Sequence, residues 1–484
     1  MNESPAERSR AFASAYKTYR GLPPLAGLAD FVAACAPGLS VEASVQRLKA
    51  AHYAWKRLHH IFLARLTAEP IYELKMAFSL HAHYCAEQVT TWRARVGEMR
   101  EPPLGLEAVP HPGLALVFDE ILAAPTTAEL LLGIYELALP ALRSSLQRHQ
   151  AAAHPLAEQP TQRMLKFALV EIDEMLAYGQ AAILALVTPA DRAVAQPART
   201  LVEVTLVTLG GLEGTAGGTL PEPLRSARPF RYDGVPRRDE RFSDPYNMGV
   251  NAEVFLYDPA QPVAGKVLMM FYKRLREIDV PEMMASILVE TRGKPWGYYR
   301  DLTRQLWDEA RHAMMGEVGF VSLGINWSQH VLVNFTWSLG LNTQLSPKER
   351  HAVLYFIEQG LMPKTGKRHE WEVALQSANP LAATFQDYDW ADEVLHARVG
   401  RDWYVSDMDS PHEAVAYGDR CWSKVLLGWT AWKESGHTAH RNWWPGLYAE
   451  YCERNGVTPV AGALAFATTY ETVRADLKEL SAPA

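Results

Sequence analysis

The run DEARH at residues 308–312 returns in closely similar form as DEVLH at residues 392–396. In an α-helix, side chains three positions apart lie on one face, so each run sets a glutamate beside a histidine. Apolar residues flank the first run at helical spacing, among them Leu302, Leu306 and Met315. A carboxylate and an imidazole on such a buried stripe carry a large desolvation cost unless they bind something. The two runs therefore predict two helices that carry metal ligands.

A further glutamate precedes each run by about one helix-turn-helix unit. The order along the chain is Glu277, Glu309 with His312, Glu358, and Glu393 with His396. Four facing helices, two giving a single glutamate and two giving Glu-x-x-His, can enclose two metal ions with six ligands. The sequence thus predicts one dimetal site built from these six residues.

Chance alone does not account for this pattern. With 55 acidic residues and 16 histidines in the chain, about two acid-x-x-His matches are expected at random. Two such matches do occur, at Asp409 with His412 and at Glu434 with His437, but Pro411 or a nearby glycine interrupts each one. The two favoured runs differ because both begin with Asp and both have a glutamate upstream.

The first helix of the set offers two candidate ligands. Folding the chain back at a turn near residue 294 brings Glu277 level with the first run. Asp279 to Glu282 reads as a capping box that opens a helix segment at Pro281. If Pro281 instead lies inside a long helix, it kinks that helix and frees the carbonyl of Glu277, and Glu282 can then turn inward. We favour Glu277 and keep Glu282 as the alternative.

The aspartate that opens each run has its own expected role. A metal-bound histidine normally donates its second ring N–H to a carboxylate, which fixes the tautomer. We expect Asp308 and Asp392 to be these acceptors, each serving the histidine of the other run.

Composition limits the classes of partner and compartment. A net charge of −7 argues against a nucleic-acid partner and against binding to an anionic membrane. The chain has no apolar run of spanning length and no apolar segment at its N-terminus. Its four cysteines are scattered without a Cys-x-x-Cys pair, which fits a reducing compartment and no zinc site. We therefore expect a cytoplasmic protein.

The chain reads as all-α, with strand-like alternation almost absent. Its length indicates two or three domains, and a Gly- and Pro-rich stretch interrupts the helical pattern. We expect a helical N-terminal domain at 1–206, a linker or surface arm at 207–250, the dimetal domain at 251–435, and a helical extension at 436–484.

The N-terminal half resembles a degenerate copy of the same bundle. Glu136 and Glu171 have a spacing like that of the C-terminal glutamates, and Glu174 stands where a ligand histidine would be. One interpretation is a second metal site. Because Glu-x-x-His is missing, we favour a structural bundle whose buried acids pair with Arg and Lys.

The runs RQLWDEARHAMMGE and DWADEVLHARVG resemble those of the ferritin-like di-iron-carboxylate superfamily over roughly residues 250–400. The resemblance implies a ferritin-like four-helix bundle, two Fe ions or a mixed Mn/Fe pair, and activation of dioxygen. It implies an oxidase or oxygenase acting on a small organic substrate; the alternative is a ferroxidase or peroxide-detoxifying protein without one. An electron donor and a homodimer are compatible with either. We expect the substrate pocket among apolar residues of the ligand helices: Met283, Met284, Trp307, Met315, Phe320, Tyr355 and Trp390.

Overall fold

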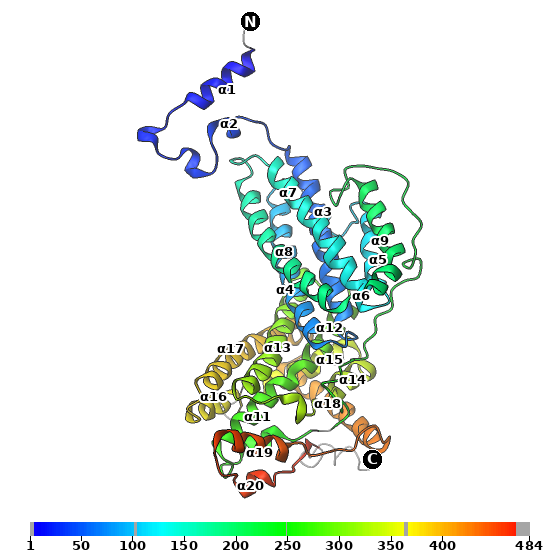
Figure 1. The fold of residues 1–484 in the computed structure, drawn as a ribbon, viewed down its shortest axis with the longest axis vertical. Helices are drawn as coiled ribbons and strands as arrows, with labels where there is room; N and C mark the ends of the chain where they lie inside the picture. The colour runs from blue at the N-terminus through cyan, green and yellow to red at the C-terminus, as the bar shows by residue number, and fades with distance from the viewer. Residues whose placement is uncertain (1–3, 101–103, 248, 363–365, 471–484) are drawn as a thin grey trace. The chain divides into compact units, whose positions relative to one another are not determined.

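The computed structural model describes residues 4–100, 104–247, 249–362 and 366–470, and over these ranges the chain forms helices and no β-strand (Figure 1). The predicted all-α class is therefore confirmed. Within the same ranges, no helix is both long enough and apolar enough to cross a bilayer.

The chain divides into two compact units, and each unit combines two separate segments. The first unit contains residues 1–61 and 84–231, and the second contains residues 62–83 and 232–484. Two long helices, α3 (Val41–Leu66) and α4 (Tyr72–Gly97), therefore each contribute to both units. The continuous domain ranges expected from the sequence differ from this division. A hydrophobic pattern shows that a helix is buried, but it does not show which partner buries it.

The first unit is also built from helices. A π-helical turn at Leu132–Ala138 carries Glu136 and leads directly into the α-helix that begins at Leu139. Besides the parts of α3 and α4, the helices are α1 (Pro5–Ala15), α2 (Phe31–Ala34), α5 (Pro112–Leu122), α6 (Thr127–Leu131), α7 (Leu139–Ala152), α8 (Gln159–Leu186) and α9 (Pro189–Leu209).

Four helical segments of the second unit pack as a closed ring. The ring consists of α11 (Val263–Leu275) with α12 (Asp279–Glu290), then α13 (Trp296–Ser322), α17 (Pro380–Trp403) and α15 (Pro347–Gly360). α13 packs on α11, α12 and α17, and α15 packs on α17 and α12. A 3-10 turn at Arg276–Ile278 joins α11 to α12. This turn follows from Pro281, which has no N–H to donate to the carbonyl of residue 277.

Two glycines let the ring helices approach closely. A Cβ on Gly316 of α13 would lie 2.2 Å from the backbone nitrogen of Leu275, and one on Gly400 of α17 would lie 2.4 Å from the ring of Tyr355. Real Cβ atoms do not approach other atoms so closely, so both positions require glycine. The first contact holds α13 against the turn that carries Glu277.

Further helices surround the ring. They are α10 (Ala252–Tyr257), α14 (Thr336–Gln344), α16 (Lys367–Gln376), α18 (Pro411–Glu434), α19 (Trp444–Asn455) and α20 (Ala461–Leu464). The C-terminal segment is part of the same core, since the rings of Trp444 and Phe255 lie 4.9 Å apart. Residues 326–335 contain only a 3-10 turn. Of the helical extension expected at 436–484, residues 465–469 are not helical, and residues 471–484 lie outside the described residues.

The segment between α9 and α10 begins at a capped helix end and contains buried side chains. α9 ends at Gly210, whose φ of 72° closes the helix in the left-handed region. In the described residues between Gly210 and α10, no α-helix or strand follows. The arm is not a free linker, because Arg238 and Phe242 are buried in the second unit.

Candidate metal centre

The ring of helices brings the six predicted ligands Glu277, Glu309, His312, Glu358, Glu393 and His396 into one buried cluster. Glu309, Glu358, Glu393 and His396 each offer a ligand atom within 4.8 Å of the others, and so do Glu277, Glu309 and His312. Glu309 belongs to both groups. One of its oxygens lies 3.1 Å from Nδ1 of His396, and the other lies 3.5 Å from Nδ1 of His312. Glu309 is therefore placed between the two halves of the cluster.

Five of these six side chains hold a buried polar atom without a hydrogen-bond partner. The atoms are Oε2 of Glu277, Nδ1 of His312, Oε2 of Glu358, Oε2 of Glu393 and Nδ1 of His396. Buried polar atoms in folded proteins usually have partners. Single atoms without one also occur elsewhere in the described residues, for example Nε1 of Trp443. Here five carboxylate or imidazole atoms converge in one cluster, which fits bound metal ions, since such atoms ligate them.

The other ring nitrogen of each histidine faces an aspartate. Nε2 of His312 lies 3.2 Å from Asp392, and Nε2 of His396 lies 3.4 Å from Asp308. This is the crossed pairing expected from the two runs. Arg311, inside the first run, contacts both aspartates, at 2.9 Å from Asp392. The aspartates thus hold Nε2 of each ring and leave Nδ1 turned toward the cluster.

The electrostatics of the cluster favour added positive charge. Burial alone lowers the pKa of His312, but the neighbouring carboxylates of Asp392, Glu277 and Glu309 raise it to about 10. The pKa of His396 is raised for the same reasons, with Asp308 as its main partner. Burial, together with the neighbouring charge of Glu393, raises the pKa of Glu358 well above its usual range. Without metal the cluster therefore gathers protons, and ligating metal ions release such protons.

Sequence reasoning missed three charged residues at this cluster. Asp389 lies one helical turn before Glu393 on α17 and forms a third candidate group with His312 and Glu393. Its i,i+4 spacing was a visible signal. Lys367 of α16 is fully buried and lies 2.7 Å from Glu393 and 2.9 Å from Asp389. Arg274 of α11 contacts Asp389 and lies 2.7 Å from Glu277. Nothing in the sequence pattern connects Lys367 or Arg274 to the two runs.

Glu282, the alternative ligand, lies outside the cluster. Its carboxylate lies 2.9 Å from Nζ of Lys75 and 2.9 Å from the guanidinium of Arg238, and it accepts a hydrogen bond from Ser338. Burial raises the pKa of Glu282, but Arg238 and Lys75 lower it below its usual value. Because these partners already occupy Glu282, the structure favours Glu277 as the ligand of the first helix.

The acids of the first unit have protein partners instead. Glu136 accepts hydrogen bonds from Arg192 at 2.8 Å and Arg199 at 2.6 Å. Glu171 accepts a hydrogen bond from Gln88, and Glu174 accepts one from Tyr84. Among the described residues of this unit, no three acids, histidines or cysteines converge as metal ligands do.

None of the residues expected to line a substrate pocket lines the hollow formed by residues of α10, α14, α15 and α18. Met283, Met284, Phe320 and Tyr355 are buried in packed cores, where they fill contacts between helices. Trp307, Met315 and Trp390 are half-buried.

Comparison of the chain with protein-family models, with curated proteins and with solved structures finds no significant match.

Proposed function

We propose that the protein is a non-haem dimetal oxidoreductase, an oxidase or oxygenase that uses two Fe ions, or a mixed Mn/Fe pair, and dioxygen to oxidise a small organic substrate. The observation that carries the proposal is the group of five unpartnered ligand atoms in the second unit. The closed ring of helices supports it, since four facing helices with this order of ligands can enclose two metal ions.

A bound pair of redox-active ions would supply the electrons that dioxygen requires. The chain's own residues prepare the site. Glu309 lies between the imidazoles of His312 and His396, whose ring centroids are 6.0 Å apart. Asp308 and Asp392 fix the orientation of those rings. Lys367 and Arg274 offset part of the buried negative charge, and the surrounding helices keep bulk water from the ligands, all of which are buried or nearly so.

Metal analysis and oxygen uptake together test the proposal. Protein from iron-replete cells should carry about two metal ions per chain, as iron or as iron with manganese. Oxygen consumption that depends on an added organic compound favours an oxidase or oxygenase. Oxygen consumption driven by Fe(II) alone would favour the ferroxidase alternative. Zinc alone, or no metal after reconstitution with Fe(II), would contradict both.

A further inference from the structure

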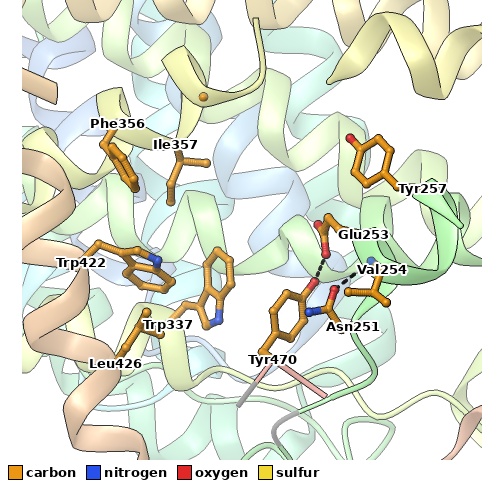
Figure 2. A pocket seen from close by; sticks show the side chains of 11 residues that line it. Asn251, Glu253, Val254, Tyr257, Trp337, Phe356, Ile357, Trp422, Leu426 and Tyr470 are labelled. Carbon is orange, nitrogen blue, oxygen red and sulfur yellow. Dashed lines mark hydrogen bonds between the residues drawn. The ribbon is translucent and has the colours of Figure 1, made fainter. Parts of the chain in front are cut away.

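The second unit contains a hollow of about 540 Å3, within the size range of small-molecule sites. Figure 2 shows the side chains that line this open space. Trp337 comes from α14, Trp422 from α18, Phe356 and Ile357 from α15, and Tyr257 from α10. None of these positions belongs to the proposed ligand set.

The walls of the hollow suit a hydrophobic molecule. The rings of Trp337 and Trp422 lie 4.6 Å apart in an edge-to-face arrangement, and Phe356 and Leu426 continue the same apolar surface. Aromatic walls offer a large contact area at a low cost in side-chain entropy. A strongly hydrated ligand would bind weakly here, because apolar walls cannot replace its hydrogen bonds to water.

One end of the hollow is polar, but its charges are already balanced. Glu253 accepts hydrogen bonds from Arg276 at 2.7 Å and from the hydroxyl of Tyr470, and Lys273 lies 3.8 Å away (Figure 2). The side chain of Glu253 is still 30% exposed. A charged ligand would find no unpaired opposite charge here, because Glu253 already faces Arg276 and Lys273. A hydroxyl, amine or amide group could donate a hydrogen bond to the carboxylate of Glu253, which has further lone pairs, whereas the hydroxyl proton of Tyr470 is already given to Glu253.

The hollow and the metal cluster are connected at two places in the chain. On α15, Ile357 lines the hollow, while its neighbour Glu358 lies 3.8 Å from His396 in the cluster. At the 3-10 turn, Arg276 does not line the hollow, but it holds Glu253, which does. Its neighbour Glu277 lies 3.4 Å from His312. A ligand in the hollow would therefore contact residues that are directly joined to two of the proposed metal ligands.

We infer that this hollow binds the organic substrate, a neutral, bulky, hydrophobic molecule that carries one hydrogen-bonding group near Glu253 and Tyr470. The assignment of this ligand as the substrate rests on the proposed function, whereas the binding site is inferred from the hollow itself. Since Arg276 and Glu277 are consecutive in the 3-10 turn, occupancy near Glu253 should also alter the surroundings of Glu277.

Gly360 offers a way to fill the hollow without straining the fold. It lines the hollow at the end of α15, and a Cβ built on it meets no atom within 4 Å. Gly462 of α20 has the same open surroundings but does not line the hollow, so it provides a matched control. Neither glycine adopts a left-handed φ. Gly360→Phe should therefore block the hollow, Gly360→Ala should block it less, and Gly462→Phe should leave it open.

The test uses N-phenyl-1-naphthylamine, a neutral hydrophobic probe with one N–H group, on the full chain. The wild type and Gly462→Phe should bind one probe molecule with the same affinity. Gly360→Phe should bind it on the order of tenfold more weakly or not at all, with unchanged helical content. In the Co(II)-loaded protein, the probe should change the visible absorption of the metal in the wild type and not in Gly360→Phe.

The outcomes separate the two proposals. Equal probe binding by wild type and Gly360→Phe would overturn the binding site. Probe binding that follows Gly360 while the Co(II) spectrum stays constant would overturn its assignment as the substrate site. If no variant binds Co(II) or Fe(II), the proposed function fails, even where probe binding still follows Gly360.

Discussion

The two units both contain half-buried or buried acids among their helices, but they satisfy those acids differently. In the first unit, Glu136 is held by Arg192 and Arg199. Burial alone raises the pKa of Glu136, but these two arginines lower it below its usual value. In the second unit, the ligand glutamates converge on one another and on imidazoles, leaving atoms without partners. An acid that pairs within the protein stabilises a fold, whereas acids left to face one another need a cation from outside.

The largest expected contrast lies in metal content. Glu309→Gln and His396→Ala should each abolish binding of the metal pair, because each removes a ligand from the centre of the cluster. Glu136→Gln and Glu171→Gln should leave metal content unchanged, since protein groups hold those side chains. Metal analysis of the four purified variants, with circular dichroism to verify folding, makes the comparison. Equal metal loss from folded variants of both units would contradict it.

A second contrast concerns the cations. Lys367→Met leaves Glu393 without its buried lysine, whereas Asp389 keeps Arg274, and the change should destabilise the metal-free protein by about 3–5 kcal/mol. Arg192→Met removes half of a partly exposed pair and should cost at most about 1 kcal/mol. Urea unfolding of the metal-free proteins measures both. Added Fe(II) should restore part of the stability of Lys367→Met. If metal-free Lys367→Met were as stable as the metal-free wild type, Lys367 would not be needed to balance the charge of the cluster.

A smaller effect is expected from the aspartates behind the histidines. Asp308→Asn or Asp392→Asn should keep the fold but weaken metal binding by about 10–100-fold, the usual result of losing such a carboxylate. Asp387→Asn is the control, because Asp387 is an exposed residue of the same helix as Asp392. Competition against a metal-binding dye gives the affinities. Unchanged affinity in both variants would remove the aspartates from the proposed centre.

The smallest effect is a pH dependence of the first unit. Burial, then the charges of Arg93 and Lys56, lower the pKa of His52 to about 3, while Glu107 opposes them weakly. Because the unfolded chain binds a proton near pH 6.5 and the folded chain does not, stability is present above pH 6.5 and is lost as the pH falls. We expect a loss of up to about 1.4 kcal/mol per pH unit from this residue. His52→Gln should flatten the slope of unfolding free energy between pH 7 and 5.5, and an unchanged slope would assign it to other groups.

The sequence was sufficient for features that repeat at helical spacing. The all-α class followed from composition, and the ligand pairs Glu309 with His312 and Glu393 with His396 follow from positions three apart. Lys367 was not predictable, because it reaches the cluster from α16 across a tertiary contact with α17. The same holds for Lys75, whose partner Glu282 lies more than two hundred residues away in the chain. Pairings of this kind depend on topology rather than on local pattern.

Residues 62–83 belong to the second unit, and this limits where the chain can be divided into fragments and in what order it can fold. Glu282 is fully buried and shares its charge between Arg238 and Lys75. A fragment that begins at residue 232 keeps Arg238 but loses Lys75, so the buried charge of Glu282 would keep only one of its two cationic partners. The fragment would also expose the apolar surface that residues 62–83 cover. During synthesis, the ribosome releases Lys75 long before Glu282 exists. The part of the chain that would house the metals therefore completes its fold only by closing a very long loop.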